Sequence, residues 1–164
     1  MSNDMKKLRL FTLALVALAL PVTAFAADPT TDTAEADVEE AEIMRILDAK
    51  DVSLDEYLWV ARPLLVFANS PADPLFIQQM QYLSRELDEL AERDVVIITD
   101  TNPSAQTDVR TKLRPRSFMM ALIGKDGQIK FRKPLPWSVR ELTRSIDKMP
   151  IRQQEIRDRR TSGS

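Results

Sequence analysis

Apolar residues recur through the middle of the chain in patterns that predict four β-strands. Residues 64–68 and 95–98 are apolar throughout, which is typical of central strands covered on both faces. Residues 118–123 predict a third strand. Residues 128–132 predict a fourth, and their alternation of apolar and basic side chains indicates a sheet edge with one face in water. Between these last two strands, the Asp-Gly pair in Gly124-Lys125-Asp126-Gly127 predicts a tight hairpin.

Helix signals lie between and after these strands. Ser53 and Glu56 have the spacing of a capping box, which predicts a short helix. Asp73 and Pro74 fit the N-cap and first position of a longer helix, which continues as an apolar stripe to Leu90. Residues 102–113 and 139–148 predict two further helices. The order β-α-β-α-β-β-α predicts an α/β fold, a thioredoxin-like three-layer sandwich with a four-stranded mixed sheet.

The ends of the chain differ from this middle part. Residues 1–26 predict a cleavable signal peptide, because a basic start and an apolar run precede the small-x-small site Ala24-Phe25-Ala26. The apolar run, residues 10–20, is too short for a spanning helix. We therefore expect a periplasmic or secreted protein with no stable membrane insertion after cleavage.

Three segments follow the predicted cleavage site. Residues 27–42 predict a disordered spacer, because they hold seven acidic residues, no basic residue and little apolar surface. Residues 43–150 are expected to form the folded domain, and residues 151–164 a basic tail that is partly helical. The net charge of the whole chain is −2. The acidic residues of the spacer are Asp28, Asp32, Glu35, Asp37, Glu39, Glu40 and Glu42.

The amino-acid composition excludes several classes of reaction. The chain contains no cysteine and no histidine. Thiol–disulfide exchange and thiol peroxidase chemistry are excluded, because both require a cysteine thiolate. The imidazole base and the commonest metal ligand are also missing. We therefore assign no catalytic residue, and we expect no metal and no cofactor.

Two loops are candidates for a ligand site. In a thioredoxin-like layout the reactive thiol lies between the first strand and the first long helix, where this chain has Asn69-Ser70-Pro71-Ala72-Asp73-Pro74. These residues are typical of turns and caps, and Ser70 has no evident base. The loop before the third strand would form the other wall, with Arg114 and Arg116.

Residues 110–133 are rich in basic side chains, with Asp126 as the one acidic residue. This pattern is typical of a solvated sheet edge protected by lysines. It is also compatible with an anion-binding site that faces the start of the long helix. The candidate ligand-binding residues are Asn69, Ser70, Arg114, Arg116, Lys125 and Arg132.

Three stretches of the sequence carry a family resemblance. Residues 54–68 (LDEYLWVARPLLVFA), 122–127 (LIGKDG) and 146–155 (IDKMPIRQQE) resemble a bacterial family of exported proteins that contain a domain of unknown function. A similar domain recurs in vertebrate extracellular sushi-repeat proteins. The resemblance implies a thioredoxin-like fold nearest to peroxiredoxins. It implies no activity, and no catalytic residue is carried over.

Two classes of function fit these observations. The first is a non-catalytic module that binds a protein or an anionic ligand in the cell envelope. Nucleic acid is not an expected partner, because stacking aromatic residues are missing from the basic stretch. The alternative is an enzyme that uses a hydroxyl or a carboxylate in the loop after the first strand.

Overall fold

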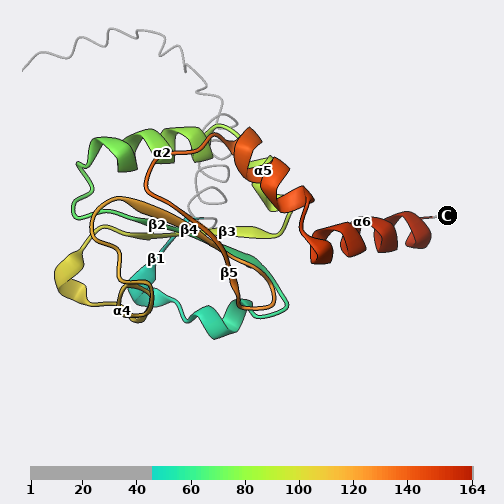
Figure 1. Ribbon diagram of the computed structural model, residues 1–164, viewed down its shortest axis with the longest axis horizontal. Coiled ribbons are helices and arrows are strands. Elements are labelled where there is room, and N and C mark those ends of the chain that lie inside the picture. Colours follow the sequence, from blue (N-terminus) through green and yellow to red (C-terminus); the bar gives the residue numbers. More distant parts are fainter. Residues whose placement is uncertain (1–45, 164) are drawn as a thin grey trace, which may run out of the picture.

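The computed structural model describes residues 46–163, which form a mixed five-stranded sheet between two layers of helices (Figure 1). The sheet order is β1-β3-β2-β4-β5. Strand β3 is parallel to β1 and to β2, whereas β4 is antiparallel to β2 and to β5. The strands are β1 (Ile46–Asp48), β2 (Arg62–Phe67), β3 (Val95–Asp100), β4 (Met119–Ile123) and β5 (Ile129–Lys133).

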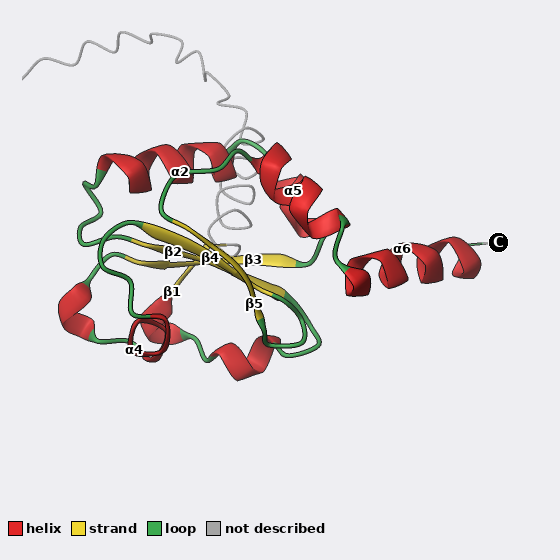
Figure 2. Cartoon of the chain, viewed as in Figure 1, coloured by secondary structure: helices red, strands yellow, loops and turns green. Residues whose placement is uncertain are grey.

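Helices cover both faces of this sheet (Figure 2). One face packs against α2 (Pro74–Ser84), α3 (Leu87–Ala91) and α5 (Val139–Asp147). The other face packs against η1 (Ala49–Asp51) and α4 (Asp108–Leu113). The remaining elements are η2 (Leu54–Tyr57), η3 (Pro103–Ala105) and α6 (Pro150–Ser162). The predicted three-layer α/β sandwich is confirmed, and its strand connectivity is the thioredoxin-like one.

Strand β2 contributes apolar side chains to both faces of the sheet. Successive side chains of a strand point to opposite faces of the sheet. Leu64 and Val66 therefore belong to the core under α2, α3 and α5, and Leu65 and Phe67 belong to the core above α4. All four side chains are buried, so the run of apolar residues fits a central strand.

Two predicted elements need correction. The sheet has five strands rather than four, because Ile46–Asp48 pairs with β3 as a short edge strand. Three residues carry too little periodicity to predict a strand. The single long helix expected to reach Leu90 is divided into α2 and α3. Glu86 leaves the helical conformation there, with φ −140°.

The short helix predicted after Ser53 forms as η2, but the predicted capping box does not form. The Ser53 side chain makes no capping hydrogen bond to η2. A capping box forms instead at α5, where the Ser138 hydroxyl accepts from the Glu141 N–H and the Glu141 carboxylate accepts from the Ser138 N–H. The hydrogen bonds from the Ser138 backbone and side chain hold the pKa of Glu141 below its ordinary value.

This difference predicts unequal effects of two similar substitutions. Ser138→Ala is expected to lower the free energy of unfolding by about 1 kcal/mol, because it removes an N-cap. Ser53→Ala is the matched control and should change stability much less, because no cap is lost. Urea unfolding of the two variants measures the difference. Equal losses would show that the box at α5 does not stabilise the protein.

The predicted segments at the two ends of the chain differ in how far the structure describes them. The predicted signal peptide, residues 1–26, and the predicted spacer, residues 27–42, lie outside the described residues. The segment after Pro150, expected as a partly helical tail, forms α6. Arg152 of this helix is buried, so α6 begins as part of the domain rather than beyond it.

Candidate functional site

The loop after β2 closes on itself and on the start of α2. The Ser70 hydroxyl accepts a hydrogen bond from the Ala72 N–H at 3.1 Å. The Asp73 carboxylate caps α2 by accepting from the N–H groups of Leu75 at 2.9 Å and Phe76 at 3.4 Å. The start of α2 therefore already holds a negative charge that belongs to the chain.

Asn69 joins this loop to the segment that leads into β4. Its side-chain N–H donates to the Arg116 carbonyl at 3.4 Å. Arg114 ends α4 in the left-handed conformation, with φ 51°. The described residues contain no cis peptide bond, so the bond before Pro115 is trans. Asn69, Ser70, Arg114 and Arg116 thus lie around the carboxyl end of β2.

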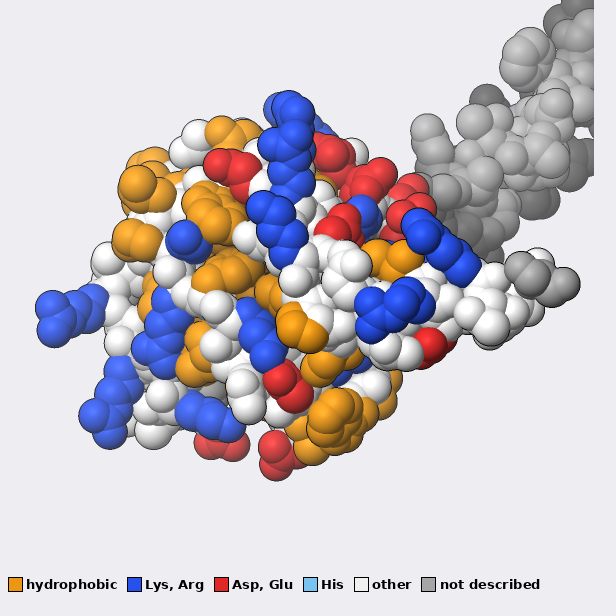
Figure 3. All heavy atoms as spheres, turned by 45° about the vertical axis from the view of Figure 1, so that its right-hand side comes forward, with side chains coloured by type: hydrophobic (Ala, Val, Ile, Leu, Met, Phe, Trp, Pro, Cys, Tyr) orange, Lys and Arg blue, Asp and Glu red, His pale blue; other side chains and the backbone are white. Residues whose placement is uncertain are grey.

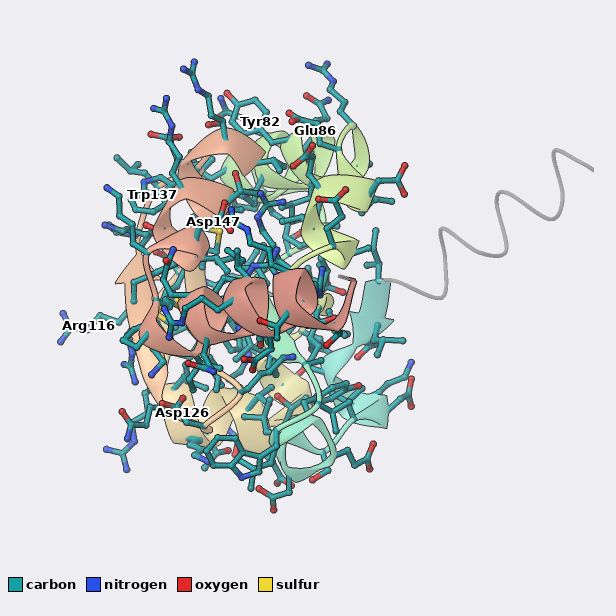
Figure 4. All side chains as sticks on the ribbon, turned by 90° about the vertical axis from the view of Figure 1, so that its right-hand side faces the viewer. Tyr82, Glu86, Arg116, Asp126, Trp137 and Asp147 are labelled. Atoms are coloured by element: carbon teal, nitrogen blue, oxygen red, sulfur yellow. The ribbon has the colours of Figure 1, made fainter. Side chains whose placement is uncertain are left out.

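Arg132 lies beside this group. It is on the edge strand β5, and its Nη1 donates to the Leu113 carbonyl at the end of α4, at 3.1 Å. We call the four exposed cations of this region the basic surface. Figure 3 shows Lys and Arg side chains gathered on the left-hand part of the face that it presents, and Arg116 projects away from the molecule in Figure 4. The basic surface consists of Lys112, Arg114, Arg116 and Arg132.

No residue of the basic surface forms an ion pair with any other residue of the described range. Of the other cations of the same basic stretch, Lys133 lies over the Trp137 ring, 4.0 Å from its centroid, and two more are paired with carboxylates. Arg110 pairs with Asp100 at 2.8 Å and Lys130 pairs with Asp126 at 2.5 Å. Within residues 110–133, the exposed cations without a carboxylate partner are therefore those of the basic surface.

Lys125 does not belong to this surface. It lies at the other end of the sheet, in the turn between β4 and β5, where its ammonium group contacts Asp94 at 2.7 Å and Glu155 at 3.0 Å. Lys125 therefore has two carboxylate partners, although the sequence alone indicated no partner for it. The structure therefore separates Lys125 from the other predicted ligand-binding residues.

Lys125 is part of a network of ion pairs that joins β2, α5 and α6 to the loop before β3 and to the turn between β4 and β5. At its centre is Arg62, which is 1% exposed. Arg62 donates to the Arg93 carbonyl and to Glu155, both at 2.8 Å, and lies 3.8 Å from Asp94. The network consists of Arg62, Arg93, Asp94, Lys125, Asp147, Arg152 and Glu155.

The cations of the network lower the pKa values of two of its carboxylates. Burial raises the pKa of Glu155, but hydrogen bonds from Arg62 and Lys125 outweigh burial and hold it at about 2. Burial also raises the pKa of Asp147, and the bidentate contact of Arg93 outweighs it, so that this pKa is lowered. Both groups are therefore ionised at neutral pH.

A second buried pair lies under the loop after β2. The Arg110 guanidinium donates to the Asp100 carboxylate and to the carbonyl oxygens of Ala68 and Asp100, over 2.8–3.0 Å. The Thr107 hydroxyl donates to the second carboxylate oxygen at 2.6 Å. This pair joins the carboxyl ends of β2 and β3 to α4 and fixes the floor of the loop.

Sequence reasoning assigned no role to Arg62, Asp100, Arg110 or Glu155. One signal was available for two of them: Arg62 and Asp100 are charged residues at the first and last positions of strands that are otherwise apolar. A charge at the end of a buried strand requires a partner. The pattern indicates that a partner exists, but it does not identify it.

Within residues 46–163, no group of three acidic side chains is placed to hold a metal ion. None of the described helices combines the length and apolar character needed to cross a membrane. The Ser70 hydroxyl makes only the turn contact to Ala72 among the described residues.

Comparison with protein families gives one match. The model of a family described as "Domain of unknown function (DUF4174)" matches residues 53–155. The last matched residue is Glu155, so the match includes the whole ion-pair network. The expected kinship with a domain of unknown function is confirmed. No curated protein matches the sequence.

Several solved structures resemble the chain at low identity. Reduced 2-Cys peroxiredoxin from Plasmodium vivax is 19% identical, with a TM-score of 0.47, over 63% of this chain and 85% of its own. Thioredoxin peroxidase I from Plasmodium yoelii is 21% identical, with a TM-score of 0.47, over 63% and 80%. StoA from Bacillus subtilis is 12% identical, with a TM-score of 0.41, over 52% and 81%. These likenesses are too distant to transfer an activity.

Proposed function

The chain belongs to the DUF4174 family, whose description names no activity. From this premise, we propose that the protein is a non-catalytic module that binds an anionic polymer through its basic surface. The observation that carries this proposal is the set of four exposed cations without an acidic partner among the described residues. Guanidinium groups bind sulfate, phosphate and carboxylate groups through paired hydrogen bonds. Several of them on one surface favour a ligand with repeated negative charges.

The contacts in the loop after β2 support a binding role over an enzymatic one. An enzyme with a hydroxyl nucleophile needs a base to activate it. Ser70 accepts a hydrogen bond from the backbone instead, and Asp73 caps α2. With no cysteine and no histidine in the chain, the common nucleophile and the common base are both missing.

The predicted signal peptide supports binding outside the cytoplasm. We propose a periplasmic or secreted protein whose ligand is an acidic polysaccharide of the cell envelope. Heparin, which carries both sulfate and carboxylate groups, serves as the probe.

Retention on heparin tests the proposal. Arg114→Ala/Arg116→Ala is expected to elute at lower salt than the unchanged protein, because two cation contacts are lost. The logarithm of the apparent affinity should also depend less steeply on the logarithm of salt, by about one unit for each lost contact.

The control removes the same charge from another face. Arg144 and Lys148 are exposed on and just after α5. Arg144→Ala/Lys148→Ala should leave elution close to that of the unchanged protein. If both double variants elute alike, retention reflects net charge alone and the basic surface is not the binding site.

A further inference from the structure

The acidic segment at residues 27–42 is complementary in charge to the basic surface. It carries seven carboxylates and no cation, whereas the basic surface consists of four cations. The segment is joined to the domain by the three residues before β1. The acidic ligand most accessible to the basic surface is therefore part of the same chain.

The length of the connection suits this contact. Strand β1 lies at one edge of the sheet, and β5, which carries Arg132, lies at the other. Four strand spacings separate them, or about 19 Å. Asp32 and Asp37 precede Ile46 by fourteen and nine residues. Fully extended chains of those lengths reach about 46 Å and about 30 Å. The direct line between the two edges runs through the sheet itself, and the longer reach allows the segment to pass around a helix layer to Arg132.

Other cations of the domain offer a weaker target. The cations of α5 and α6 share these helices with Glu141 and Asp158, which are exposed. Those carboxylates repel an acidic segment at short range. Arg114, Arg116 and Arg132 have no ion-pair partner among the described residues, whereas Lys112 lines a pocket together with Asp55 and Asp108. The attraction is therefore least opposed at Arg114, Arg116 and Arg132.

We infer that the acidic segment, residues 27–42, docks on the basic surface of its own chain and competes there with the anionic polymer. The docking is independent of the polymer, whereas the competition rests on the proposed function. The segment then acts as a built-in competitor that a polymer of higher charge density displaces.

A spin label tests the docking directly. Because the chain has no cysteine, Ala36→Cys provides a single site for a nitroxide and retains all seven carboxylates. At low salt, the label is expected to broaden the amide signals of Arg114, Arg116 and Arg132 more than those of Arg144 and Lys148. At about 1 M salt, where the screening length is about 3 Å, the excess broadening should vanish.

The labelled chain also needs a charge control. Glu35→Gln/Asp37→Asn removes the two charges that flank the label, so it should reduce the excess broadening without changing the length of the connection. Broadening that is equal over both faces, or that persists at about 1 M salt, overturns the docking.

Heparin retention separates the docking from the competition. In the unlabelled chain, Glu35→Gln/Asp37→Asn should elute at higher salt than Glu56→Gln/Glu86→Gln, which removes the same charge from exposed positions of the domain. If excess broadening is found but the two variants elute alike, the docking stands and the competition is wrong. If heparin does not retain the chain at all, the proposed function fails, while the label still tests the docking.

Discussion

Glu155→Ala is expected to lower the free energy of unfolding by about 3–5 kcal/mol, because it leaves a buried cation without its closest partner. Arg62 is 1% exposed and contacts Glu155 at 2.8 Å. Its remaining carboxylate neighbour, Asp94, lies at 3.8 Å and is shared with Lys125. A domain of this size has a total stability of about 5–15 kcal/mol, so the loss is a large fraction of it.

The control comes from the same helix. Asp158 is exposed on α6 and accepts one hydrogen bond from Gln154. Asp158→Ala should cost no more than about 0.5 kcal/mol, as is usual for surface substitutions. Arg62→Met combined with Glu155→Ala should cost less than the sum of the single substitutions, by about 0.5–3 kcal/mol, because the two residues contact each other. Additive losses would show that the network contributes nothing as a pair.

The stabilisation by the Glu155 carboxylate should be lost at low pH. The ordinary pKa of Glu155 is 4.5, and in the folded protein it is about 2. A carboxylate with a lowered pKa stabilises the fold fully above its ordinary value, and this contribution is lost as the pH falls toward the folded value. Urea unfolding between pH 4.5 and pH 2 should therefore show a steeper decline for the unchanged protein than for Glu155→Ala.

Local patterns in the sequence were sufficient to predict the core of this fold. The two apolar runs form β2 and β3, and the Asp-Gly pair lies in the turn between β4 and β5. In these places one local pattern determines the element. The short edge strand β1 was missed, because three residues at a sheet edge are defined by their partner strand rather than by their own pattern.

The ion-pair network could not be predicted because its contacts join distant parts of the chain. Arg62 and Glu155 are 93 residues apart, and Lys125 and Asp94 are 31 apart. The three stretches that carried the family resemblance contain Arg62, Lys125, Asp147, Arg152 and Glu155. These stretches therefore contain five of the seven network residues, but only the topology shows that they meet at one end of the sheet.

For the basic stretch, the sequence identified the charged residues but not which of them are paired. Counting charges along residues 110–133 correctly found an excess of cations. Counting could not separate Arg110, Lys125 and Lys130, which have carboxylate partners, from Arg114, Arg116 and Arg132, which have none among the described residues. Pairing depends on which side chains the strands and α4 bring together, and it decides which charges remain for a ligand.

Asp100→Asn is expected to destabilise the opposite end of the sheet by a similar amount, about 3–5 kcal/mol. The substitution keeps the shape of the side chain but removes the charge that balances Arg110, and both side chains are nine-tenths buried or more. Arg110 also donates to the Ala68 carbonyl, and the Ala68 N–H donates to the Asp100 carbonyl. Loosening this pair should therefore expose the amide of Ala68 to hydrogen exchange.

The location of that exchange distinguishes the two buried pairs. Asp100→Asn should speed exchange at Ala68 and in the loop that follows it, and leave α6 protected. Glu155→Ala should speed exchange in α6 and leave Ala68 protected, because Glu155 and Asp100 belong to separate networks at opposite ends of β2. Asp108→Asn, at an exposed position of α4, is the matched control for Asp100→Asn. If Asp100→Asn is as stable as this control, the Arg110–Asp100 pair does not hold the floor of the loop, and the placement of Asn69 beside Arg116 must depend on other contacts.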